Sequence, residues 1–176
     1  MASSDRYLRY LLILLALVGV LAIQSAVLVH LPVAGARPQL PLVVVMVMGL
    51  LRGPETGLSL GLCMGLLVDL HGGRLTGSHT VFLGLAGLAA GWLSIKLFSD
   101  SVLVPAVIVG LGSLVYEAAY LLVMNAFGFG FPWQTAGVRV ILPTGLYNLA
   151  LTLVVYPLCL RWFGRSREEA PSFPLF

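Results

Sequence analysis

Long apolar runs, separated by short breaks of glycine, proline and charged residues, make up most of this chain. The runs predict helical spans over residues 10–31, 40–51, 56–70, 77–98, 102–127 and 138–163. An α-helix of ~20 apolar residues is long enough to cross a bilayer. We therefore predict an all-α polytopic membrane protein, a compact bundle of six transmembrane helices. Residues 1–163 would form a single transmembrane domain, and residues 164–176 a cytoplasmic tail that we expect to be disordered.

The second and third spans are shorter than the ~20 residues of a full crossing. Between them lie Arg52, Gly53, Pro54 and Glu55. One continuous helix would place Arg52 at mid-membrane, at a cost of ~2.5–3.5 kcal/mol. It would also place Pro54 inside a helix, where proline removes a hydrogen bond. Two short helices joined by a tight turn avoid both costs, with Pro54 in the turn or at the first helical position.

The composition agrees with a membrane location. Hydrophobic residues make up 59% of the chain and charged residues 10%, whereas soluble domains carry about 25% charged residues. The formal charge of +3 comes from few residues. Because the chain has no basic run and no RNA-binding motif, we expect no nucleic-acid partner.

The N-terminal apolar stretch resembles a signal peptide at first sight, because Arg6 and Arg9 precede an apolar run over residues 11–23. The run continues to Leu31, which is longer than the apolar region of a signal peptide and long enough to cross a membrane. We therefore expect a first membrane helix that is retained.

The basic residues predict the orientation of the spans. With an inner N-terminus, the inner side holds Arg6, Arg9, Arg52, Lys96, Arg161, Arg165 and Arg167, and the outer side holds Arg37, Arg74 and Arg139. Cytoplasmic segments of membrane proteins are enriched in Lys and Arg. This distribution favours an even number of spans with both termini in the cytoplasm.

Two rows of glycine predict close helix packing. Gly57, Gly61 and Gly65 recur every four residues on the third span, and a second row on the fourth span consists of Gly84, Gly87 and Gly91. Small residues at this spacing let two helix backbones approach closely inside a membrane. We infer that the third and fourth spans pack tightly within one bundle. A dimer seam is the alternative interpretation of the row on the third span.

Asp69 continues the row of the third span and ends it near the predicted outer surface. Charged groups near membrane helices usually pair with another group or face water. One interpretation is a structural carboxylate that pairs with Arg74 or His71 and orients the turn. The other is a contact with a partner or a ligand.

Glu117 is the most unusual residue of the fifth span, and Asn148 lies at about the same depth in the sixth. At a rise of ~1.5 Å per residue, both positions lie ~15 Å below the outer ends of their helices. The two side chains could therefore hydrogen-bond across the helices. A structural hydrogen bond and a functional contact with a partner, a ligand or a proton are both open.

The inner half of the predicted bundle is nearly pure Leu, Val and Ala. Further polar residues map to the outer half: Gln24, His30, His79 and Asn125. These groups either satisfy one another or mark a place where a partner helix or a small ligand enters.

Residues 127–133 alternate aromatic and flexible residues. We expect this segment to lie as a loop in the outer interface, with partner docking as the alternative.

Catalysis and metal binding find little support in the sequence. It contains no G-x-S-x-G, HExxH, P-loop or dinucleotide fingerprint, and no paired intramembrane aspartates. Cys63 and Cys159 lie inside apolar runs and form no CxxC pair, so packing is the simplest interpretation of both. We expect a non-catalytic protein with no cofactor and no metal.

Four motifs follow one another in the middle third of the chain: Ala36-Arg37-Pro38, Leu51-Arg52-Gly53, the glycine row ending in Gly65-Leu66-Leu67-Val68-Asp69-Leu70, and Leu75-Thr76-Gly77. Together they resemble the MreD family of rod shape-determining proteins in the bacterial inner membrane. Thr76 stands where the family pattern leads us to expect proline. The C-terminal half resembles the family in hydropathy alone.

The resemblance implies a scaffold of the cell-elongation machinery that binds MreC and supports peptidoglycan synthesis. RodA, a class B penicillin-binding protein, the actin-like MreB and membrane lipid are the further partners that it implies. It also implies a fold similar to the substrate-binding components of energy-coupling-factor vitamin transporters. The alternative function is therefore a small-molecule-binding subunit of such a transporter.

Overall fold

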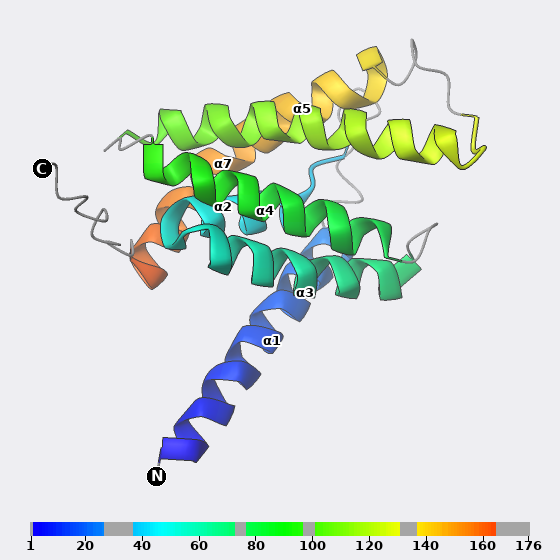
Figure 1. The fold of residues 1–176 in the computed structure, drawn as a ribbon. Helices are drawn as coiled ribbons and strands as arrows, with labels where there is room; N and C mark the ends of the chain where they lie inside the picture. Colours follow the sequence, from blue (N-terminus) through cyan, green and yellow to red (C-terminus); the bar gives the residue numbers. More distant parts are fainter. Residues whose placement is uncertain (1, 27–36, 73–76, 97–100, 131–136, 165–176) are drawn as a thin grey trace, which may run out of the picture.

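The structure is a computed structural model that describes residues 2–26, 37–72, 77–96, 101–130 and 137–164. The described part contains six α-helices and a short π-helical turn (Figure 1). They are α1 (Ala2–Ala26), α2 (Leu40–Arg52), α3 (Pro54–Gly72), α4 (Ser78–Lys96), α5 (Leu103–Ala126), the turn η2 (Gly137–Ile141) and α7 (Leu142–Phe163). Each predicted span has its own helix, so the prediction of six helices is confirmed for these residues.

The helix ends differ from the predicted ends most at the first and last spans. Helix α1 begins at Ala2 rather than at residue 10, since a helix can continue beyond the apolar run that defines a span. The sixth span opens with the turn η2 before α7 begins. Several predictions fall on residues outside the described ranges: those for His30 and Arg74, for residues 131–133 of the aromatic segment and for residues 165–176 of the tail.

Two elements are long and apolar enough to cross a membrane by themselves: α5 and the continuous stretch Gly137–Phe163. Residues 11–26 of α1 and all of α2 form shorter apolar helices. The outward faces of α5 and α7 expose large apolar side chains such as Val115, Leu146 and Val154. Lipid is a suitable solvent for such a surface, whereas water is not.

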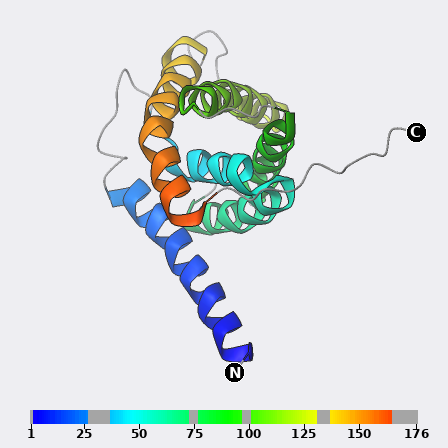
Figure 2. The same ribbon diagram turned by 90° about the vertical axis from the view of Figure 1, so that its left-hand side faces the viewer.

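Helix α2 is the central element of the bundle. It contacts each of the other five α-helices, and every residue from Leu40 to Leu51 except Val44 is buried. Figure 2 shows α2 enclosed by its neighbours in the end-on view. At ~1.5 Å per residue a helix of 13 residues is ~20 Å long, which is shorter than the ~30 Å hydrocarbon core. Since protein surrounds α2, it does not need to span the bilayer alone.

Helix α1 lies at the periphery. Of its described side chains, Leu17 alone is buried. In Figures 1 and 2 the helix leaves the bundle obliquely, and its N-terminal end stands apart from the other helices. Its contacts go to α2 and α3. Therefore α1 is held to the bundle mainly by its C-terminal half.

The two glycine rows face each other across the contact between α3 and α4, the most extensive helix contact among the described residues. A Cβ added to Gly61 would overlap the carbonyl of Leu83 and lie 2.8 Å from the Cα of Gly84. A Cβ on Gly65 would lie 2.6 Å from the backbone nitrogen of Thr80. These gaps are too small for any side chain, so glycine is what lets the two backbones touch.

The same close approach continues along the rows. A Cβ on Gly57 would lie 2.6 Å from the carbonyl carbon of Gly87, and a Cβ on Gly91 would lie 2.6 Å from that of Gly53. Gly49 on α2 also packs against α4, since a Cβ added to it would lie 3.2 Å from the backbone nitrogen of Gly91. Gly84 differs, since a Cβ there would meet the movable side chain of Leu62.

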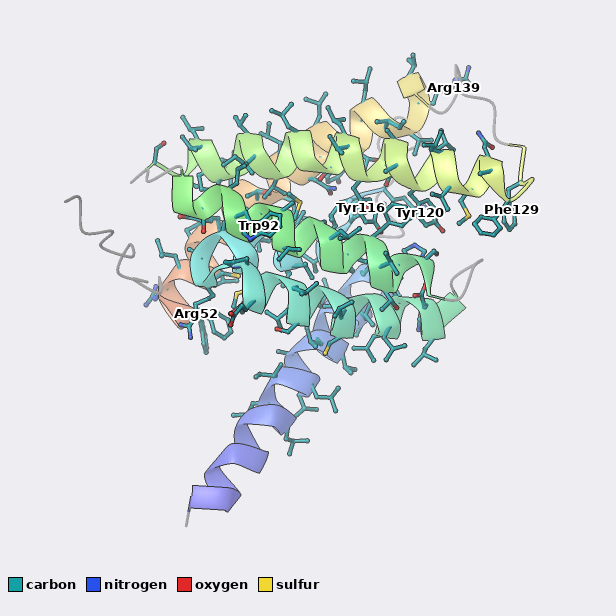
Figure 3. All side chains as sticks on the ribbon, in the orientation of Figure 1. Arg52, Trp92, Tyr116, Tyr120, Phe129 and Arg139 are labelled. Carbon is teal, nitrogen blue, oxygen red and sulfur yellow. The ribbon has the colours of Figure 1, made fainter. Side chains whose placement is uncertain are left out.

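The turn between α2 and α3 has the predicted form. Gly53 adopts a φ of 91°, which glycine tolerates because it has no Cβ, and Pro54 is the first residue of α3. The Arg52 guanidinium donates a hydrogen bond of 2.8 Å to the carbonyl of Phe163 at the end of α7. A cation is favourable at a helix C-terminus. This contact also brings the turn and the end of α7 to the same end of the bundle (Figure 3).

Candidate functional site

The N-terminus of α2 begins inside the bundle, where its free backbone groups need partners other than water. Gln24 of α1 supplies two of them. Its side-chain carbonyl accepts a 2.9 Å hydrogen bond from the Leu40 backbone N–H, and its amide donates at 2.9 Å to the Pro38 carbonyl. Gln24 therefore links the end of α1 to the start of α2.

Asn148 of α7 satisfies the next backbone group. Its carbonyl oxygen accepts a 2.9 Å hydrogen bond from the Gln39 backbone N–H, and its amide donates at 3.0 Å to the Ser113 hydroxyl on α5. Ser113 in turn donates to the carbonyl of Val109. Asn148 is fully buried, so it joins three helices at one point in the interior.

Glu117 of α5 meets the same segment through a side chain. The Gln39 side-chain amide donates a hydrogen bond to the Glu117 carboxylate. The predicted direct hydrogen bond between Glu117 and Asn148 is wrong, because each side chain instead accepts a hydrogen bond from Gln39. The depth estimate placed the two side chains at one level, but the residue that lies between them comes from the start of α2. We call Gln24, Gln39, Glu117 and Asn148 the α2 cap cluster.

The contacts of this cluster predict which substitutions couple. In a double-mutant cycle, Gln39→Ala and Glu117→Ala should be non-additive, since each removes the same side-chain hydrogen bond. Interhelical hydrogen bonds in membranes average ~0.6 kcal/mol and reach ~1.7 kcal/mol, so the coupling should lie in this range. The measurement is unfolding of the purified variants in mixed detergent micelles.

The matched cycle is Gln39→Ala with Asn148→Ala. It should show little coupling, because Asn148 accepts from a backbone N–H that alanine retains. Strong coupling in this second cycle, or none in the first, would contradict the geometry.

Asp69 of α3 performs a similar role at the start of α4. Its carboxylate accepts hydrogen bonds from the backbone N–H groups of Gly77 at 3.0 Å, His79 at 3.2 Å and Thr80 at 3.0 Å. It also accepts from the Thr80 hydroxyl at 2.7 Å and lies 3.1 Å from Nδ1 of His79. A carboxylate is favourable at a helix N-terminus. Asp69 thus caps α4 from a neighbouring helix.

The partner of Asp69 differs from the expected one. The carboxylate pairs with His79, which sequence spacing alone did not suggest. Arg74 lies outside the described residues. The exposed His71 is not among the partners of Asp69 in the described chain. The reason is geometric. The start of α4 lies beside the last turn of α3, so the backbone N–H groups of Gly77, His79 and Thr80 reach the Asp69 carboxylate.

Aromatic side chains extend this region toward α5. The His79 ring lies 4.8 Å from the Tyr120 ring, and Tyr120 stacks on Tyr116 at 6.3 Å. Phe82 contacts both tyrosines edge-on. In Figure 3 the two tyrosines lie on the side of α5 that faces the bundle. Such ring pairs stabilise a contact beyond the apolar area that they bury.

The residues that sequence reasoning did not single out are Gln39, Ser113 and Thr80. Each lies where a helix begins or where two helices cross. Gln39 had a usable signal, because it is a polar residue directly before an apolar run that has proline at its second position. Ser113 and Thr80 had no such signal, since their roles depend on side chains from other helices.

The arrangement explains structure rather than chemistry. Within the described residues, every buried side-chain nitrogen or oxygen has a hydrogen-bond partner. The same part of the chain holds no group of three or more His, Cys, Asp and Glu residues that could bind a metal. Cys63 and Cys159 are free thiols. The polar side chains that looked like functional candidates are thus engaged in holding helix ends.

These features define an integral membrane protein in which a few polar side chains cap helix ends inside an apolar bundle. The model of the family described as rod shape-determining protein MreD matches residues 5–165. The chain therefore belongs to the MreD family. Proteins of this family are rod shape-determining membrane proteins of the MreBCD cell-shape machinery.

The chain is also similar to the sensor protein LytS of Oceanobacillus iheyensis, with 29% identity over 133 residues. The similar region covers 73% of this chain but 22% of LytS, so the chain spans less than a quarter of that relative. No solved structure matches. The expected similarity to energy-coupling-factor components stays a prediction.

Proposed function

We propose that this chain is a non-catalytic scaffold of the cell-elongation machinery that binds MreC directly and so supports cell-wall synthesis. The observation that carries the proposal is the family match over residues 5–165. RodA, a class B penicillin-binding protein and MreB would belong to the same larger complex. Residues 1–163 would act as one transmembrane unit, with residues 164–176 as a tail.

The distribution of polar groups supports a scaffold. The α2 cap cluster and Asp69 find their partners inside the bundle, whereas the outer faces of the helices are apolar. Partner proteins in the membrane would then be recognised by packing of apolar helix faces, which is how membrane helices associate. Glu117 and Asn148 would act indirectly, by keeping α2 and its neighbours in position.

We place the chain in the bacterial inner membrane with both termini in the cytoplasm. The hydrogen bond between Arg52 and Phe163 supports this topology, because it brings two positions from the predicted inner side to one end of the bundle. Arg161 lies in the last turn of α7 at the same end, as the preference for inner basic residues requires. Labelling from outside the cell of a cysteine introduced at Gly164, with Cys63 and Cys159 replaced, would contradict it.

Co-purification with MreC tests the scaffold function. The full chain, tagged at one end, is expressed together with MreC and extracted in a mild detergent. We expect MreC to remain with it through washing, and to be absent from an unrelated polytopic membrane protein that carries the same tag. Reproducible loss of MreC from a correctly folded chain would overturn the proposal.

A further inference from the structure

A cavity of about 440 Å³ lies at the end of the bundle where α1 and α3 end and α2 and α4 begin. Its size falls within the range of small-molecule sites. Five segments of the chain line it, including α5 through Tyr116. The cavity adjoins both the α2 cap cluster and the Asp69–His79 pair.

The polar part of the lining is rich in hydrogen-bond donors, and Arg37 is its permanent cation. Arg37, His71 and His79 line the cavity together with Gln24 and Gln39. The described lining contains no carboxylate. The two nearby acids are already engaged, since Asp69 caps α4 and Glu117 accepts from Gln39.

Arg37 is the group most available to a ligand. Within the described residues it forms no ion pair or hydrogen bond, and it is exposed three residues before α2 begins. Its guanidinium is always charged and presents a fork of donors that matches an oxyanion. His79 uses Nδ1 toward Asp69, which leaves its other ring nitrogen available.

The remaining wall is apolar and consists mainly of Leu21, Leu42, Val68 and Leu83. A cavity with a cationic rim and an apolar wall suits a molecule that combines an acidic group with hydrocarbon. A simple ion would contact only the polar part of the lining, and an uncharged apolar molecule would contact only the apolar part.

We propose that this cavity binds the oxyanion group of an amphipathic molecule, with Arg37 as its principal contact and the apolar wall in contact with its hydrocarbon. The oxyanion could come from an anionic phospholipid of the leaflet at this end or from a soluble phosphate-bearing compound. This site does not depend on MreC binding, so the scaffold function can fail without affecting it.

The test uses the purified full chain in uncharged detergent and three probes: phosphatidylglycerol, phosphatidylcholine and glycerol 3-phosphate. Binding is measured by native mass spectrometry and by the shift in thermal unfolding. We expect phosphatidylglycerol to bind in preference to phosphatidylcholine. Arg37→Gln should weaken this binding about tenfold, the effect of losing a hydrogen bond to a charged group.

Arg139→Gln is the matched control, because Arg139 is an exposed arginine of η2 on the same predicted side that does not line the cavity (Figure 3). It should leave binding unchanged. Val68→Phe provides a second probe that narrows the cavity and retains Arg37, and it should also weaken binding.

The outcomes distinguish a lipid from a soluble compound as the source of the oxyanion. Arg37-dependent binding of phosphatidylglycerol without binding of glycerol 3-phosphate assigns a lipid, and Arg37-dependent binding of glycerol 3-phosphate assigns a soluble compound. Equal loss in Arg37→Gln and Arg139→Gln would show that surface charge alone attracts the anion and would overturn the proposal. Equal binding of phosphatidylcholine, or no binding of any probe, would overturn it as well.

Discussion

Gly61→Ala should destabilise the bundle although it adds one methyl group and favours the helical state. The new Cβ would overlap the carbonyl of Leu83 and crowd the Cα of Gly84. Both are backbone atoms, so no rotamer change relieves the contact and α3 must move away from α4. Overpacking of this kind costs about 1–3 kcal/mol. We expect a loss of this size in the free energy of unfolding, measured in mixed detergent micelles.

Gly19→Ala is the control for this substitution. Gly19 lies inside α1, and a Cβ there would meet no atom within 4 Å. Alanine should be neutral or stabilising there, by up to about 0.5–1 kcal/mol, because it lowers the entropic cost of forming a helix. If the two variants had the same stability, the close contact between α3 and α4 would be wrong.

Asp69→Ala should produce the second large effect. The substitution removes the acceptor of the backbone N–H groups of Gly77, His79 and Thr80, and the partner of two side chains. Loss of a helix cap and of hydrogen bonds to a charge costs about 2–4 kcal/mol. We expect a lower unfolding midpoint and a turn between α3 and α4 that is more easily cleaved by protease.

Two further variants make this prediction specific. Asp69→Asn should fall between wild type and alanine, because an amide keeps one acceptor oxygen and loses the charge. Glu55→Ala removes an exposed acid from the first turn of α3 and should change stability by no more than about 0.5 kcal/mol. If Asp69→Ala were as mild as Glu55→Ala, the cap of α4 would contribute little.

The short helix α2 accounts for most of the unusual polar residues in this membrane protein. Because the helix starts among buried residues of the bundle, neighbouring side chains supply acceptors for its first N–H groups. Gln24 and Asn148 accept from two of them, and Glu117 holds the Gln39 side chain. Residues that resemble a ligand or proton site in the sequence therefore have a structural explanation, and two of the cluster, Gln24 and Gln39, also line the adjoining cavity.

The glycine rows show how far a pattern can be interpreted without a structure. The spacing of Gly57, Gly61 and Gly65 predicts a face that approaches another helix, because every fourth residue lies on one side. The second row on the fourth span made packing within one bundle the favoured interpretation, with a dimer seam as the alternative. The structure places these glycines against α4 of the same chain.

The sequence by itself determined the membrane class, the number of helices and the turn at Gly53 and Pro54. These depend on local properties: the length of an apolar run, the missing N–H of proline and the missing Cβ of glycine. Only the tertiary structure decided that Glu117 and Asn148 meet at Gln39 rather than each other, that Asp69 caps α4, and that Arg37 opens onto a cavity. Such contacts join residues far apart in the chain, and their geometry depends on how the helices cross, which no local pattern records.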